Sequence, residues 1–132
     1  MRDFKQMVEG QTLAVVGNAT SIFDSGQGTE IDSCDIVLRM NAGFASNPAC
    51  QGTRTDVWVS SLALPVKKVI SGFAPKMVVW ATSKRRMIPP DYSKQEFKFV
   101  KHPLWEWARL RYRLRARPST GLIIANYLFR QC

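Results

Sequence analysis

The fold of this chain is decided by residues 12–41, which contain the run TLAVVGN (12–18) and the run GQGTEIDSCDIVLRMN (26–41). Residues 12–16 are mostly apolar and β-branched, and they stop at Gly17-Asn18. Residues 36–40 form a second apolar run, which stops at Asn41. Short apolar runs bounded by turn-forming residues are typical of buried strands. We therefore predict two strands, each followed by a polar residue at its carboxyl end.

Three further runs downstream of these two also have the character of strands. Residues 57–59 and 77–81 are apolar, and residues 97–100 alternate in the manner of an edge strand. Segments of helical character lie between the runs, notably around residues 64–71. This interleaving predicts a single α/β domain over residues 1–132, with a mostly parallel sheet flanked by helices.

Gly17, Asn18 and Asn41 are the first candidates for contact with a ligand. A glycine lets the backbone approach a ligand closely, and an asparagine amide offers a donor and an acceptor to a phosphate or a sugar hydroxyl. Ligands of open α/β sheets bind outside the carboxyl ends of the strands, so both amides would converge on one crevice. The alternative is that the two asparagines only close turns. Their spacing leaves both interpretations open.

A second candidate site is the start of the last helix. Residues 118–121 read PSTG and are followed by an apolar run over residues 122–130. This pattern predicts a helix with Ser119 or Thr120 as its N-cap. A helix N-terminus with free N–H groups binds phosphate or carboxylate, although an ordinary capped helix has the same pattern.

These stretches together resemble the long and short sialyl motifs of the sialyltransferase family, glycosyltransferase family 29. The long motif runs from a strand with V-V-G-N through G-x-G-x-E-I-D to D-x-V-x-R-x-N, and residues 15–41 contain every fixed letter in order. Residues 118–121, with the apolar run and Cys132, resemble the opening of the short motif. Residues 52–56 (GTRTD) match a polar loop of the family less specifically. The resemblance implies a Rossmann-like fold of the glycosyltransferase-A-variant type.

The resemblance also implies a reaction, the transfer of sialic acid, or a related ulosonic acid such as Kdo, from a CMP donor to a hydroxyl of a glycan acceptor. Asn18 and Asn41 would contact the nucleotide and its phosphate, and the start of the last helix would face the donor from the other side. The implied donor site consists of Gly17, Asn18, Asn41, Ser119, Thr120 and Gly121. The family works without a bound metal, so we expect no metal and no cofactor. The acidic residues Asp24, Glu30, Asp32 and Asp35 are expected to order turns and loops.

The catalytic residue stays unassigned, because the family's catalytic histidine lies in motifs beyond the short motif. The sequence stops at Cys132, inside the short motif, which favours a truncated glycosyltransferase over a degenerate protein that kept only donor binding. In both cases we expect no transferase activity of the chain on its own. His102 is the only histidine and precedes the short motif. Beside Pro103, it is interpreted as a structural or surface residue.

The three cysteines, Cys34, Cys50 and Cys132, have no C-x-x-C spacing and predict free thiols instead of a zinc site or a disulfide framework. Many animal members of the family join the two motifs by a disulfide, and the resemblance places Leu13 where the partner of Cys132 would be. No apolar run is long enough to span a membrane, and the first ten residues are too polar for a signal peptide. We therefore expect a cytoplasmic protein, with contact at the membrane periphery left open.

The net charge of +9 is concentrated in the second half of the chain. Residues 1–60 carry four Lys/Arg and seven Asp/Glu, a balance of −3, and residues 61–132 carry fifteen and three, a balance of +12. The most basic stretch mixes aromatics with Arg109, Arg111, Arg113 and Arg115. It predicts contact with a membrane or lipopolysaccharide, or else an ordinary solvated helix.

The competing function for the whole chain is therefore a basic module that binds nucleic acid or a membrane surface without catalysis. No helix-turn-helix, zinc-finger or RNP pattern is present, so no specific nucleic-acid partner is expected. The apolar helix from Leu122 is expected to be partly exposed, which favours a homo-oligomer.

Overall fold

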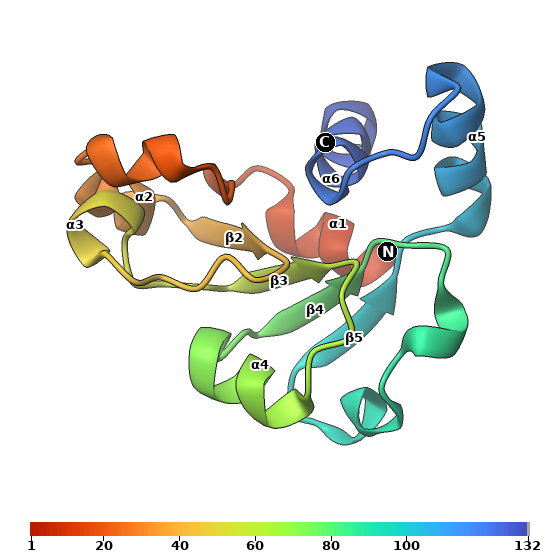
Figure 1. The fold of residues 1–132 in the computed structure, drawn as a ribbon, viewed down its shortest axis with the longest axis horizontal. Helices are drawn as coiled ribbons and strands as arrows, with labels where there is room; N and C mark the ends of the chain where they lie inside the picture. The colour runs from red at the N-terminus through yellow and green to blue at the C-terminus, as the bar shows by residue number, and fades with distance from the viewer. Residues whose placement is uncertain (132) are drawn as a thin grey trace.

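The protein, described over residues 1–131 by a computed structural model, is built on one five-stranded sheet (Figure 1). All neighbouring strands are parallel, and their order in the sheet is the order in the chain. The strands are β1 (Leu13–Val16), β2 (Ile36–Met40), β3 (Val57–Ser60), β4 (Met77–Trp80) and β5 (Lys98–Lys101). The α/β class, the parallel sheet and each of the five predicted strands are confirmed, including β5 as an edge strand.

Within residues 1–131, six α-helices and three short 3₁₀ helices connect the strands and complete the layers. The α-helices are α1 (Arg2–Val8), α2 (Gly28–Ser33), α3 (Pro48–Gln51), α4 (Val66–Phe73), α5 (Leu104–Leu114) and α6 (Thr120–Gln131). The 3₁₀ helices are η1 (Thr20–Asp24), η2 (Arg85–Met87) and η3 (Pro90–Lys94). The predicted helix around residues 64–71 is α4, which begins only after Pro65, the residue at its N-cap. A proline interrupts a helix interior but is tolerated at its start, which explains the later beginning.

The two faces of the sheet bury different side chains, because successive residues of a strand point to opposite faces. On one face, strand residues such as Leu38 and Val59 pack with Phe4 of α1 and with Ile124 of α6. On the other face, Trp58 and Val78 pack with α4 and with η3. Figure 1 shows this layering, with α1 and α6 on one side of the sheet and α4 on the other.

The sequential strand order has a consequence for where a ligand can bind. In a doubly wound sheet the ligand crevice forms where the strand order reverses. No reversal occurs among the five described strands. Instead, α6 returns across the sheet from its far side, so that its first residue, Thr120, reaches the carboxyl end of β2. The carboxyl edge of the sheet is therefore completed by a helix from the end of the described chain.

No helix within residues 1–131 is both long enough and apolar enough to cross a membrane.

Candidate functional site

Asn41 joins three elements at the carboxyl edge of the sheet. It follows β2 with a φ of 50°, in the left-handed region that asparagine tolerates better than most residues. Its side-chain Nδ2 donates to Thr120 Oγ1 at 3.2 Å, and its Oδ1 accepts the N–H of Ser61 at 2.9 Å. Its main-chain carbonyl accepts the indole N–H of Trp58 at 2.7 Å. The Asn41 amide therefore holds the ends of β2, β3 and α6 together.

Asn18 lies beside this junction at the end of β1. Its Nδ2 donates to the carbonyl of Met40 at 3.0 Å, and its side chain is exposed. Gly43 lies against it so closely that a Cβ there would fall 2.2 Å from Asn18 Oδ1. At Gly17, by contrast, an added Cβ would meet no atom within 4 Å, so the space beside this glycine is open. A hollow of about 280 Å³, lined by β1 and α2, also borders Gly17.

The N-terminus of α6 completes the arrangement. Ser119 is the capping residue, because its Oγ accepts the N–H of Leu122 at 3.2 Å and its carbonyl accepts the N–H of Ile123. Thr120, the other predicted N-cap, is instead the first residue of the helix and is turned toward Asn41. Gly121 lies next to Met40, where an added Cβ would be 3.5 Å from the sulfur.

The structure thus gathers the predicted site residues of β1, β2 and α6 around one edge. Asn18 bonds to the last residue of β2, and Asn41 bonds to Ser61 and to Thr120 of α6, so the turn-closing interpretation describes their present contacts. Their role toward a ligand stays a prediction. Ser61 was missed by the sequence reasoning, although its hydroxyl lies 2.7 Å from Thr120 Oγ1. Its position directly after β3, at the same edge, was the signal that could have found it.

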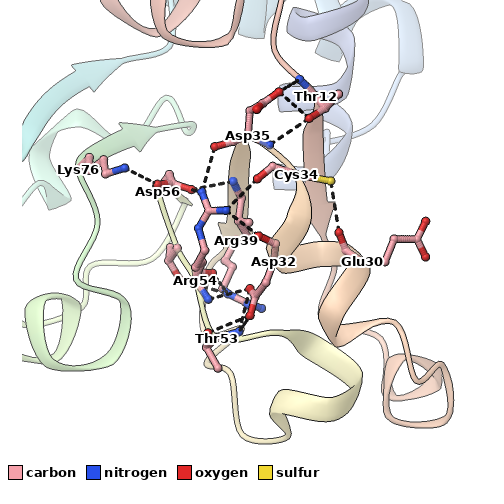
Figure 2. A network of polar contacts seen from close by, with 12 residues as sticks. Thr12, Glu30, Asp32, Cys34, Asp35, Arg39, Thr53, Arg54, Asp56 and Lys76 are labelled. Atoms are coloured by element: carbon pink, nitrogen blue, oxygen red, sulfur yellow. Dashed lines mark hydrogen bonds and ion pairs between the residues drawn. The ribbon is translucent and has the colours of Figure 1, made fainter.

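The opposite, amino edge of the sheet carries a network of ion pairs and hydrogen bonds centred on Asp56 (Figure 2). Asp56 is 3% exposed and accepts from Lys76 Nζ at 2.8 Å, Arg54 Nη2 at 2.9 Å and the N–H of Val37 at 2.9 Å. Burial by itself raises the pKa of the Asp56 carboxyl, but these hydrogen bonds and the two positive charges outweigh burial and lower it. Asp56 is therefore an ionised, fully paired structural residue.

Arg54 and Asp32 extend this network into the loop over residues 52–56. Arg54 Nη1 donates to the carbonyls of Asp32 and Cys34 at 2.7 and 2.8 Å. The Asp32 carboxylate accepts the N–H groups of Thr53 and Arg54, and these bonds overcome burial to lower its pKa. Asp35 is bound in a similar way by the hydroxyl and N–H of Thr12, which lower its pKa. Asp32 and Asp35 order loops, as expected from the sequence.

Arg39, a fixed residue of the long motif, also belongs to this structural network. Its side chain is 1% exposed and donates to the carbonyls of Arg54 and Gln51 at 2.9 and 2.7 Å. Burial lowers the pKa of its guanidinium, and the negative charge of Asp32 opposes this effect. Within the described residues, no group of three or more His, Cys, Asp or Glu side chains is placed to hold a metal ion.

His102 lies at the carboxyl end of β5 and is 2% exposed. Its Nε2 is 3.2 Å from Oε2 of Glu106, which is also buried, and the Arg85 guanidinium donates to its main-chain carbonyl. Burial, followed by the positive charge of Arg85, lowers the pKa of the imidazole to about 4. His102 is therefore a neutral core residue at neutral pH. The prediction that His102 is a structural residue is confirmed, and the alternative that it lies on the surface is wrong.

Cys34 and Cys50 are free thiols, as expected, and Cys132 lies outside the described residues. The basic stretch around Arg109 to Arg115 forms α5 and the residue that ends it, and its four arginines are exposed. Leu122 and Phe129 of α6 are 41% and 90% exposed, which agrees with the expected partial exposure of this helix.

Comparison with known proteins gives a consistent result. The family model for glycosyltransferase family 29 (sialyltransferase) matches residues 5–131. The chain is 30% identical to the mouse CMP-N-acetylneuraminate-beta-galactosamide-alpha-2,3-sialyltransferase 1 and 28% identical to the human protein of that name. Each comparison covers 97% of this chain and 44% of the relative, so the chain spans less than half the length of these relatives.

A solved structure shows the same fold. It is a mammalian sialyltransferase in complex with Gal-beta-1-3GalNAc-ortho-nitrophenol, with a TM-score of 0.62 and 23% sequence identity. The comparison covers 97% of this chain and 54% of that one. The sequence motifs, the parallel sheet and the family match agree, and the chain belongs to glycosyltransferase family 29, the sialyltransferases.

Proposed function

We propose that the carboxyl edge of the sheet binds the CMP part of a CMP-sialic acid or a related CMP-linked ulosonic acid. The observation that carries this proposal is the convergence of Asn18, Asn41 and the first turn of α6 on one edge, in a chain that belongs to the sialyltransferases. The donor would then give its sugar to a hydroxyl of a glycan acceptor.

The two asparagines would have different parts in donor binding. Asn41 Nδ2 gives one hydrogen to Thr120, and its Oδ1 accepts from Ser61 and, at 3.5 Å, from Thr120, which leaves the second hydrogen of Nδ2 for a ligand. Asn18 uses only Nδ2 and is exposed, with open space beside the neighbouring Gly17. Asn41 would therefore be a pre-oriented contact, and Asn18 a contact that adjusts to the ligand.

The first turn of α6 would receive the phosphate. N–H groups in the first turn of a helix have no intrahelical partner, and the helix dipole favours negative charge there. The Ser119 hydroxyl oxygen already accepts the N–H of Leu122. The N–H groups of Thr120 and Gly121 would then face the CMP phosphate, whose negative charge grows as the sugar departs. Binding of this kind needs no resident metal and no cofactor.

The described residues do not supply an evident base for the acceptor hydroxyl. His102 is buried against Glu106 and is not proposed for this part. The competing function, a non-catalytic nucleic-acid or membrane module, is not supported by the family match.

The test is calorimetry of the protein with CMP, UMP and AMP. We expect CMP to bind most tightly, and equal or absent binding of the three nucleotides would refute the proposed donor site. Asn41→Gly removes the amide, and glycine accepts the φ of 50° without strain. We expect CMP affinity to fall about 5- to 150-fold, which corresponds to roughly 1–3 kcal/mol for an unpaired polar partner.

The matched control is Asn126→Ala, which removes an amide of the same chemistry about 9 Å along α6 from Thr120. We expect this variant to bind CMP as the unchanged protein does. Raising the salt concentration separates donor binding from nucleic-acid binding, because the latter weakens steeply through release of counterions.

A further inference from the structure

Helix α5 has an inner side that belongs to the core of the protein. Glu106 is 5% exposed and faces His102, and Trp107 and Leu110 pack against the core cluster that includes Tyr127. At 100° per residue, Glu106, Leu110 and Trp107 occupy one arc of the helix. The orientation of α5 on the protein is thereby fixed, and so is the identity of the side chains that point away.

The outer side of α5 carries an apolar strip. Leu104, Ala108 and Tyr112 follow one another at intervals of four residues, and Trp105 lies beside them, so the strip spans roughly 100° of the helix. Leu104 is 49% exposed, Trp105 62% and Tyr112 86%. Figure 1 shows α5 at the periphery of the molecule, where it does not cover the sheet.

Arginines border this strip on both sides. Arg109 lies along one border and Arg111 along the other, followed by Arg115 at the residue that ends the helix, and Arg113 lies further round, beside Glu106 and Asn126. All four are exposed, and the guanidinium of Arg111 lies 5.6 Å from the centre of the Trp107 ring. The one acidic residue of α5 is Glu106, on the inner side. The outer face is therefore apolar along its centre and positive along both borders.

We propose that α5 docks on an anionic lipid surface, lying in its plane with the strip at the boundary of headgroups and acyl chains. An exposed apolar strip bordered by cations is the pattern of interfacial helices: the aromatic rings enter the boundary and the guanidinium groups bind lipid phosphates. Each arginine near such a surface contributes roughly fivefold in affinity. Duplex nucleic acid would satisfy the arginines alone and leave Leu104 and Trp105 without an apolar partner.

The placement of α5 relates this surface to the proposed donor site. The segment that contains α5 leaves β5 at Lys101 and returns at Thr120, and both of these residues lie at the carboxyl edge of the sheet. A lipid surface against α5 would therefore be near the edge where the donor is proposed to bind. The lipid proposal itself does not depend on the identity of the donor.

The experiment is co-sedimentation of the protein with vesicles of phosphatidylcholine alone or with added phosphatidylglycerol. We expect binding to the anionic vesicles only. Trp105→Ser with Tyr112→Ser removes the centre of the strip and keeps every charge, and we expect at least a tenfold loss. Arg109→Gln with Arg111→Gln removes one charge from each border, and we expect a loss of roughly 25-fold.

The control is Lys67→Gln with Lys68→Gln, which removes the same charge from two exposed residues of α4. We expect this variant to bind anionic vesicles as the unchanged protein does. If it loses as much vesicle binding as the arginine variant, the effect is one of overall charge and the proposal is overturned. Equal binding of the unchanged protein to both kinds of vesicle would also overturn the proposal. So would a second result, in which the serine variant keeps its vesicle binding and the unchanged protein binds duplex DNA as tightly as it binds anionic vesicles. Dissociation of an oligomer in the serine variant, without vesicle binding by the original chain, would identify the strip as a self-association surface instead.

Discussion

The two edges of the sheet carry polar residues of opposite kinds. At the amino edge, Asp56, Arg54 and Lys76 are joined by ion pairs and hydrogen bonds of 2.8 to 2.9 Å around a buried carboxylate. At the carboxyl edge, the neutral amides and hydroxyls of Asn18, Asn41 and Thr120 make hydrogen bonds that involve no ion pair. The difference shows that the two edges are built from different chemistry. The residues at the amino edge hold the loops in place, and those at the carboxyl edge are the ones that we propose for ligand binding.

The largest effect is expected from Asp56→Ala at the amino edge. The substitution leaves the N–H of Val37 and the guanidinium of Arg54 without their carboxylate, and breaking a buried pair from one side costs roughly 3–5 kcal/mol. Urea denaturation would measure this loss in the free energy of unfolding. Lys76→Ala is the control: its side chain is 71% exposed, so a loss of less than about 1 kcal/mol is expected. Comparable losses in the two variants would contradict the central place of Asp56.

A smaller effect, dependent on pH, is expected from His102, at the far end of the carboxyl edge. Burial lowers the pKa of this imidazole from 6.5 to about 4, so between these values the unfolded chain binds a proton that the folded protein does not. Stability should therefore fall as pH is lowered through 6.5 toward 4, by up to about 1.4 kcal/mol per unit. Urea midpoints at pH 7.5 and pH 5 would measure the slope.

The slope should be shallower in His102→Gln, which has no group that titrates in this range. The paired carboxylates Asp32, Asp35 and Asp56 do not interfere, because their pKa values are lowered from 3.8. An identical slope in the unchanged protein and the variant would mean that His102 is protonated in the folded state. The buried His102 would then be a charged partner of Glu106, and the far end of the carboxyl edge would resemble the amino edge.

The smallest effect on stability is expected from Asn18→Ala. The exposed side chain makes a hydrogen bond to the Met40 carbonyl, so its loss should cost about 1 kcal/mol or less. The CMP affinity of the same variant should nevertheless fall several-fold, measured by calorimetry. The contrast with Asp56→Ala would sharpen the difference between the edges. A large loss of stability with unchanged affinity would place Asn18 among the structural residues.

Much of the fold followed from local patterns of the sequence. The five apolar runs became five strands, because β-branched residues bounded by turn formers leave little choice of local structure. The PSTG stretch predicted the start of α6, because a hydroxyl before an apolar helix satisfies a free N–H group. The long motif identified the family, which the family model confirms.

Other features depended on contacts between residues that are distant in the chain. Asn41 and Thr120 are 79 residues apart, and only the return of α6 over the sheet brings their side chains within 3.2 Å. Ser61 joins them for the same reason, and only its position directly after β3 marks it in the sequence. The burial of His102 beside Glu106 likewise depends on how α5 packs, which a lone histidine before a proline does not reveal.

The sequence by itself determined the strands, the capped helix and the family, because those depend on the order of residues within short segments. The tertiary structure alone decided which polar residues of the long motif are held by the loops. Loop N–H groups bind the Asp32 carboxylate and main-chain carbonyls accept from the buried Arg39, whereas Asn18 is exposed and Asn41 is half-buried. Burial and hydrogen-bond partners, which set the free energy of each polar group, are properties of the packed chain.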